Sequence, residues 1–159
     1  MPRLRKDSYP VLTVDAIVRK NSDEILIEQR GVEPYKGSLA FPGGHVEYGE
    51  TVEHAVLREL WEECSVVATL RSILGVYSDP TRDPRGQRVS VVFIADYKRG
   101  TVKAGDDARS VFWMKIEDLR RRRSLLAFDH KLIFRDYLTW RNSVKNENWD
   151  YTFWSSKKR

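Results

Sequence analysis

The sequence predicts an α/β domain in which a mixed β-sheet lies between helices. Several segments rich in Val, Ile and Phe have the composition of strands. Two longer segments instead repeat their apolar residues at helical spacing. Along the chain the order is strands, helix, strands, helix, which is typical of helices packed on a central sheet.

The length of 159 residues and the hydrophobic content of 41% predict a single domain with a sizeable core. We place the core at about residues 9–143 and a polar tail with interspersed aromatic residues at 144–159. No internal repeat and no linker marks a second domain.

The predicted strands are bounded by turn residues and carry many β-branched side chains. They are residues 11–20, 24–30, 38–41, 66–76, 88–97 and 109–114. The turn at 21–23 joins the first two as a hairpin, and loops are expected at 31–37, 77–87 and 98–107. After the third strand, Pro42-Gly43-Gly44 is predicted to turn sharply, since two adjacent glycines let the backbone approach a ligand closely.

The clearest predicted helix spans residues 52–64, with Thr51 as its N-cap. Its apolar stripe is Val52, Val56, Leu57, Leu60 and Cys64. A short helix is expected at 117–123, and a C-terminal helix at 129–143. The spacing that predicts the latter is that of Leu132, Ile133, Asp136 or Tyr137, and Trp140.

The net charge of +5 comes from 28 Lys and Arg against 23 Asp and Glu. A basic surface around an acidic site suits an anionic ligand such as a diphosphate, although charge alone does not separate this from nucleic acid. The single cysteine, Cys64, excludes an intramolecular disulfide and a multi-cysteine zinc site. No apolar run approaches a membrane span, and the N-terminus lacks a secretory apolar region, so we expect a cytoplasmic location and no membrane partner.

Three carboxylates on the 52–64 helix carry the strongest chemical signal. Glu59, Glu62 and Glu63 stand at i, i+3 and i+4, so their side chains emerge on one helix face. Hard divalent cations take such oxygen ligands and leave positions for water and substrate phosphates. The alternative interpretation is a solvated helix face with i,i+4 pairs to arginine.

The segment GHVEYGETVEHAVLRELWEECSV, residues 44–66, resembles the Nudix box of the Nudix hydrolase (MutT-like) family. The matching positions are Gly44, Glu50, Arg58, Glu59, Leu60, Glu62, Glu63 and Val66. Ser65 departs from the pattern, which has glycine there to close the helix in a left-handed conformation. Serine should cost a little stability or shift the cap, but it removes no metal ligand.

The resemblance implies an α/β/α sandwich with a mixed sheet and a site for Mg²⁺ or Mn²⁺. It implies that Glu59, Glu62 and Glu63, with the carbonyl of Gly44, hold the metal. Arg58 would orient the glutamates, and Glu50 would act outside the primary ligands. The general base is left open between Asp106 or Asp107, on a loop facing the box, and Glu59; the acidic loop also fits a plain turn.

Two further segments resemble the ADP-ribose pyrophosphatase subgroup of this family: SDPTRDPRG at 78–86 and LAFDH at 126–130. Arg82 and Arg85, stiffened by neighbouring prolines, are expected to bind phosphate or ribose oxygens, and Asp83 is grouped with them. The alternative is a surface loop held together by Asp–Arg pairs.

Three neighbouring features have two interpretations each. Phe128 or Tyr35 is expected to stack on a base, or else to belong to the core. Asp129 is interpreted as the N-cap of the last helix, and His130 either as a pocket residue or as part of that cap. The basic run 120–123 is interpreted as a solvated helix edge, with an RNA contact as the alternative.

The leading hypothesis is a metal-dependent hydrolase that cleaves ADP-ribose, or a related nucleoside diphosphate sugar, to AMP and a sugar phosphate. Within the same class, the alternative is a nucleoside triphosphate pyrophosphohydrolase. From another class, the alternative is a non-catalytic ADP-ribose or nucleotide sensor. Related regulators add a DNA-binding domain and tend to lose box carboxylates, whereas this chain keeps its glutamates and continues only briefly after residue 143. No specific nucleic-acid partner is expected, and the subgroup implies a homodimer.

Overall fold

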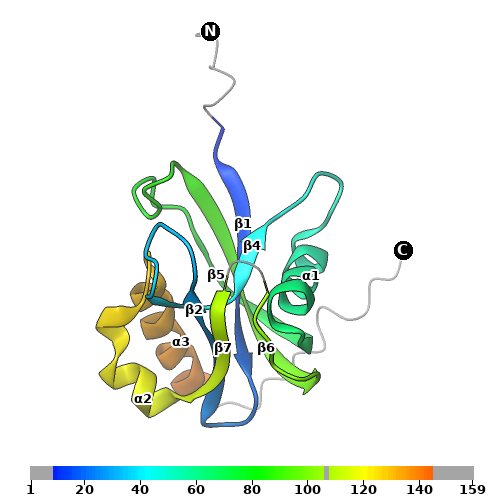
Figure 1. The fold of residues 1–159 in the computed structure, drawn as a ribbon, viewed down its shortest axis with the longest axis vertical. Coiled ribbons are helices and arrows are strands. Elements are labelled where there is room, and N and C mark those ends of the chain that lie inside the picture. Colours follow the sequence, from blue (N-terminus) through cyan, green and yellow to red (C-terminus); the bar gives the residue numbers. More distant parts are fainter. Residues whose placement is uncertain (1–8, 106–107, 145–159) are drawn as a thin grey trace, which may run out of the picture.

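A central mixed sheet with helices on both faces forms the body of the protein (Figure 1). The computed structural model describes residues 9–105 and 108–144. Helix α1 covers one face of the sheet, and α2 and α3 lie on the other, which confirms the predicted α/β/α sandwich.

The strands and helices follow one another with few residues outside them. The strands are β1 (Val11–Arg19), β2 (Glu24–Arg30), β3 (Leu39–Ala40), β4 (Gly43–His45), β5 (Val67–Tyr77), β6 (Arg88–Arg99) and β7 (Ala108–Lys115). The helices are α1 (Val52–Cys64), α2 (Ile116–Arg121), the 3-10 helix η1 (Arg123–Leu125) and α3 (His130–Val144).

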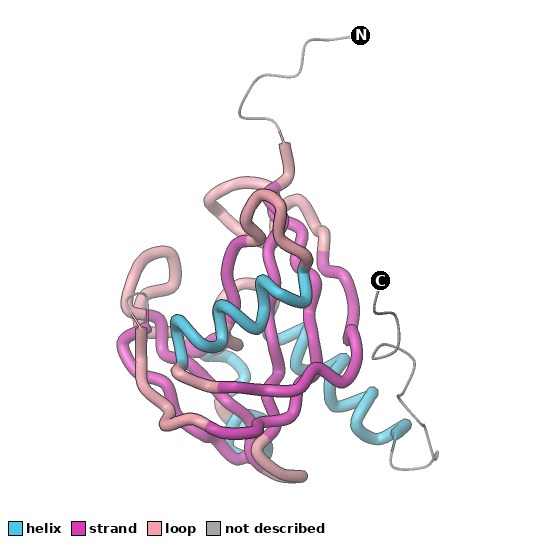
Figure 2. The backbone as a smooth tube through the Cα atoms, turned by 90° about the vertical axis from the view of Figure 1, so that its right-hand side faces the viewer, coloured by secondary structure: helices cyan, strands magenta, loops and turns pink. Residues whose placement is uncertain are grey.

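The sheet is held together by pairings between distant parts of the chain (Figure 2). Its main order is β3-β2-β1-β6-β5, with β4 paired to β1 and β7 paired to β2. Strands β1 and β6 run parallel, whereas the other pairs are antiparallel. The parallel pair brings Asp15 beside Val92 and Thr13 beside Ser90, and thereby places the middle of β1 under the loop that precedes β6.

Alternation along β1 divides the interior into two apolar layers. Val14, Ala16 and Val18 face α1 and pack against its buried Val56 and Leu60, among other residues. Ile17 belongs to the opposite layer, which α2 and α3 cover. Successive side chains of a strand point to opposite faces, so one strand supplies both cores.

Most predicted elements are confirmed within a few residues, and three expectations are wrong. The glycine segment does not only turn, since Gly43 and Gly44 pair with β1 as part of β4. The helix expected at 117–123 ends at Arg121, and a separate 3-10 turn follows. Leu132 was expected on the apolar side of the last helix, but it is 38% exposed, and the buried face is formed by Ile133, Phe134 and Tyr137.

Both ends of α1 are capped as the sequence predicts. The Thr51 side chain accepts a hydrogen bond from the backbone N–H of His54. At the other end, Ser65 adopts the left-handed conformation, with φ of 56° and ψ of 36°. Its N–H donates to Trp61 O at 3.0 Å, so the serine keeps the cap in place and accepts the strain that glycine avoids.

Replacing Ser65 with glycine is expected to stabilise the protein. Glycine adopts a left-handed conformation without a Cβ penalty, so we expect the free energy of unfolding to rise by about 0.5–1 kcal/mol. Urea denaturation measures this change. Ser72, which lies in β5, serves as the control: its replacement by glycine should destabilise, because glycine weakens a strand interior. An unchanged or lower unfolding free energy for Ser65→Gly would contradict the assignment of strain to Ser65.

Among residues 9–105 and 108–144, no helix combines the length and the apolar character that crossing a membrane requires.

Candidate functional site

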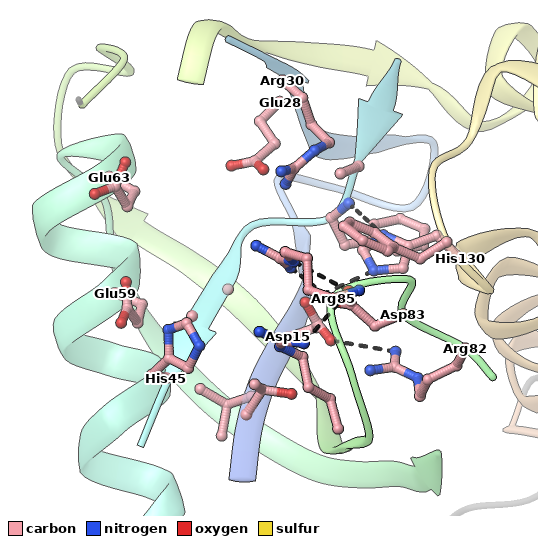
Figure 3. Close-up of a pocket in the computed structure, with 18 of the residues that line it drawn as sticks. Asp15, Glu28, Arg30, His45, Glu59, Glu63, Arg82, Asp83, Arg85 and His130 are labelled. Carbon is pink, nitrogen blue, oxygen red and sulfur yellow. Dashed lines mark hydrogen bonds and ion pairs between the residues drawn. The ribbon is translucent and has the colours of Figure 1, made fainter. Parts of the chain in front are cut away.

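A cavity of about 320 Å³ opens between α1 and the segments that carry the two subgroup motifs (Figure 3). One wall holds the box carboxylates Glu59, Glu62 and Glu63. The opposite wall holds arginines from β2 and from the segment before β6, and aromatic rings from the segment before α3. The floor is formed by β1 and β4. The fold therefore brings the expected metal-binding and substrate-binding residues to one cavity.

Gly44 lies directly against the Glu59 carboxylate. A Cβ at position 44 would clash with all three atoms of that carboxyl group. The absence of a side chain at Gly44 thus lets the box helix approach β4 closely enough for a backbone group and a carboxylate to share one small space. This close approach is the structural reason for glycine at the first position of the box.

Arg58 organises the glutamates from beneath. Its Nη1 donates to Glu59 Oε1 at 3.0 Å and to Glu62 Oε2 at 3.1 Å. Its Nε and Nη2 donate to the two oxygens of Glu50, and Nη2 also donates to His45 O at 2.9 Å. The surrounding carboxylates, Glu50 above all, raise the pKa of the Arg58 guanidinium.

Glu50 is held as an anion outside the cavity wall. The hydrogen bond from Arg58, followed by one from the backbone N–H of Glu47, lowers the pKa of Glu50 to about 2. It binds Arg58 at 2.9 Å and does not line the cavity as drawn by its wall residues. Its position agrees with the expectation that it acts outside the primary metal ligands.

The Glu59 carboxyl carries an electrostatic burden that a cation would relieve. Burial raises its pKa, the hydrogen bond from Arg58 opposes that rise, and the charges of Glu63 and Glu62 add to it. Among the described residues, no group of three His, Cys, Asp or Glu side chains is already gathered around one point. The donor set nevertheless fits a hard divalent cation, because the wall offers carboxylate oxygens and the space kept open at Gly44 adjoins one of them.

The loop that carries the two expected base candidates begins against the same helix end. Asp106 and Asp107 lie outside the described residues. Just before them, the N–H of Gly105 donates to Glu63 O at 2.8 Å. A Cβ at Gly105 would come within 2.7 Å of Glu62 O and 2.8 Å of a Glu63 carboxylate oxygen. The chain therefore enters the 106–107 segment in contact with the box carboxylates.

The SDPTRDPRG loop is built from Asp–Arg pairs and also lines the cavity. The buried Arg82 donates to both oxygens of Asp129, at 2.8 and 2.7 Å. Arg85 donates to both oxygens of Asp83, at 3.0 and 2.7 Å. All three of Arg82, Asp83 and Arg85 line the cavity, so the two interpretations of this loop describe the same structure.

Asp129 does not cap α3 with its side chain as expected. Its carboxylate is engaged by Arg82, and only its backbone carbonyl accepts from Leu132 and Ile133 at the start of the helix. The reason is tertiary: the loop before β6 inserts a guanidinium where a capping contact would otherwise form. The basic run 120–123 is exposed, as its interpretation as a solvated edge predicts.

His130 belongs to the cavity floor. The backbone N–H of Phe41 donates to its Nδ1 at 3.0 Å, which places the ring proton on Nε2. That nitrogen lies 3.8 Å from Asp15 Oδ1, and Ser90 Oγ donates to the other Asp15 oxygen. Burial lowers the pKa of His130, so the neutral ring is favoured.

Sequence reasoning missed several residues of the cavity. They are Asp15, Glu28, Arg30, His45 and Arg88. Asp15 had a detectable signal, because a carboxylate in the middle of the otherwise apolar β1 needs buried partners. Arg30 had none, since an arginine at the end of a strand is common and its neighbours are set by other segments.

The fold and the cavity define a protein that presents box glutamates to an anionic substrate, and the comparisons agree. The NUDIX domain family model matches residues 10–137. The chain therefore belongs to the Nudix family.

Characterised relatives narrow the similarity further. The chain is 46% identical over 134 residues to the ADP-ribose pyrophosphatase of Methanocaldococcus jannaschii, covering 84% of this chain and 76% of the relative. Among solved structures, it is similar to the bifunctional NMN adenylyltransferase/ADP ribose pyrophosphatase of Francisella tularensis, complexed with AMP and a manganese ion. That match has a TM-score of 0.76 and 30% identity, and covers 84% of this chain but 42% of the longer one.

A third similarity is to a different kind of protein. The NUDIX domain of Shewanella oneidensis NrtR, solved with ADP ribose, matches with a TM-score of 0.74 and 27% identity. The match covers 88% of this chain and 92% of that one.

Proposed function

We propose that this protein is a divalent-metal-dependent pyrophosphatase that hydrolyses ADP-ribose, or a closely related nucleoside diphosphate sugar, to AMP and a sugar phosphate. The observation that carries the proposal is the shared cavity, in which the box glutamates face the arginines of the SDPTRDPRG loop. The 46% identity to an ADP-ribose pyrophosphatase supports the choice of substrate.

The proposed metal ligands are Glu59, Glu62 and Glu63, with the carbonyl of Gly44, and Mg²⁺ or Mn²⁺ is the proposed ion. When bound, such an ion neutralises the diphosphate oxygens and lowers the pKa of a water. Arg58 keeps two of the glutamates in place by donating to both from one nitrogen. It is a positioning residue, because it contacts the glutamates and Glu50 from the side away from the cavity.

The general base is proposed to be Asp107, on the loop whose preceding residue Gly105 contacts Glu63. A base must lie within hydrogen-bond reach of the attacking water, and this loop is anchored beside the carboxylates. Asp106 and Glu59 are the alternatives. Replacing each by asparagine or glutamine separates them, since only loss of the base removes the acidic limb of the pH–rate profile.

The substrate-binding residues are proposed to be Arg82, Arg85, Asp83 and Phe128, all of which line the cavity. Arg82 acts differently from the expectation of a direct fork on phosphate. Its guanidinium is committed to Asp129, and Asp15 lies 4.0 Å away, so it holds the loop and α3 together beneath the ligand. Arg85, which is partly exposed, is the residue of this loop best placed to reach substrate.

A substrate panel with Mg²⁺ near pH 8 tests the proposed function. The panel contains ADP-ribose, other nucleoside diphosphate sugars, dinucleoside polyphosphates and nucleoside triphosphates, with products separated by chromatography. We expect AMP to appear fastest from ADP-ribose, and addition of excess EDTA to abolish its formation.

Two outcomes of the panel would contradict the proposal in different ways. Inorganic pyrophosphate released fastest from a triphosphate would keep the metal site and replace the substrate. Binding of ADP-ribose without hydrolysis of any compound would indicate a sensor, as the similarity to the NrtR domain allows. The retained glutamates at 59, 62 and 63 favour the enzyme. A cytoplasmic location, a single-domain organisation and a homodimer stay predictions.

A further inference from the structure

Phe128 occupies an unusual position between two cations at the mouth of the cavity. The guanidinium carbon of Arg30 lies 4.9 Å from the centre of its ring, and that of Arg85 lies 5.4 Å from the same centre. Tyr35 packs edge-on against the ring at 4.8 Å. The ring is therefore surrounded by protein groups, which leaves little of it to stack on a base.

The backbone at Phe128 and Tyr35 is held in a conformation that such residues avoid. Phe128 has φ of 52° and Tyr35 has φ of 64°, both in the left-handed region. Bulky residues persist there only when their surroundings hold them, and such residues cluster at ligand clamps. Here the flanking segments are tied down, since Ala127 N–H donates to Leu39 O at 2.8 Å and His130 N–H donates to Ala127 O at 3.0 Å.

The two arginines come from separate segments and reach the same side of the cavity. Arg30 ends β2, and its Nε donates to Pro34 O at 2.8 Å. Arg85 comes from the loop before β6 and is paired with Asp83. In Figure 3 both lie across the cavity from Glu59 and Glu63. A ring attracts a cation over its face, so one phenylalanine fixes two long, flexible side chains.

We propose that Phe128 is a positioning residue that holds Arg30 and Arg85 as a two-arginine binding site for phosphate groups of the substrate. The inference rests on the proposed function and extends it to Arg30. Guanidinium groups match phosphate oxygens with paired N–H donors. A diphosphate in this cavity then lies between the arginines and the carboxylate wall.

Hydrolysis of ADP-ribose by single and combined variants tests this role. Phe128→Leu removes the ring face and keeps apolar bulk; we expect KM to rise about tenfold and kcat to stay within about twofold. Phe128→Tyr keeps the ring and should restore the wild-type KM. Arg30→Gln should raise KM by about tenfold or more, because a charge-assisted contact is lost. Arg120→Gln is the matched control, since it removes an exposed arginine outside the cavity and should change neither constant.

The decisive comparison places Phe128→Leu in a chain that already carries Arg30→Gln and Arg85→Gln. If the ring acts through the arginines, its loss has at most about a twofold further effect on KM, because residues in one network are not additive. A full tenfold effect in that background would show that the ring touches the substrate and would overturn the proposal. So would a lower kcat with unchanged KM in Phe128→Leu.

A binding experiment separates this inference from the proposed function. Calorimetry with inorganic pyrophosphate, in the absence of metal, is expected to show binding to the wild-type protein that weakens about tenfold or more in the double arginine variant. Equal binding to both would overturn the anion site even if ADP-ribose is hydrolysed. Failure to hydrolyse ADP-ribose, with this loss of pyrophosphate binding retained, would instead reject the substrate and keep the site.

Discussion

Replacing Glu63 with glutamine is expected to reduce kcat for ADP-ribose at least about a hundredfold while the fold survives, and Glu62→Gln should do the same. Each replacement removes a proposed metal ligand from the cavity wall. Neither removes apolar contacts, and each relieves repulsion among carboxylates at i, i+3 and i+4. The melting temperature without added metal should therefore stay equal to the wild type or rise slightly.

Glu53→Gln is the matched control for this pair. It makes the same change of charge in the first turn of the same helix, away from the residues that line the cavity. Its kcat should equal that of the wild type. Isothermal calorimetry with Mn²⁺ adds a readout independent of turnover: affinity should fall for the Glu62 and Glu63 variants and stay unchanged for the control. Near-normal turnover in purified Glu63→Gln would reject the metal site.

Alanine at the two adjacent glycines is expected to have opposite consequences. At Gly44, the added Cβ meets the Glu59 carboxylate, which is the flexible end of a side chain. We expect Gly44→Ala to move that carboxylate and lower kcat/KM by about tenfold or more with little loss of stability, since small displacements of a catalytic group carry large rate effects.

At Gly43, the added Cβ meets backbone. It would clash with Val14 O and come within 2.8 Å of Asp15 Cα in the paired strand β1. The strands must separate, so we expect Gly43→Ala to lower the free energy of unfolding by about 1–3 kcal/mol. Urea denaturation and initial rates, measured on both variants, separate the two effects. A stable Gly43→Ala, or a fully active Gly44→Ala, would show that β4 adjusts more freely than its contacts indicate.

These pairs of variants also show why the sequence predicted one part of the site and not another. The positions of Glu59, Glu62 and Glu63 on one face follow from helical geometry alone, because residues three and four apart are neighbours on any helix. The Thr51 cap and the left-handed Ser65 are equally local. For the same reason the hairpin of β1 and β2 was predictable from its turn residues.

The strand β4 was not predictable in this way. Two glycines favour a turn on local grounds, and only pairing with β1 makes Gly43 and Gly44 part of the sheet. Asp129 illustrates the same limit. Its place before a helix predicts a cap, but a guanidinium from residue 82 takes its carboxylate.

The sequence by itself thus determined the family chemistry: a glycine, a capped helix and carboxylates on one face of it, all within residues 44–66. The tertiary structure decided what stands opposite. Arg30, Arg85 and Phe128 meet because strand β2, the loop before β6 and the segment before α3 converge on one edge of the sheet. Helical periodicity relates near neighbours in sequence, whereas such meetings depend on strand pairings between distant segments, to which no local spacing responds.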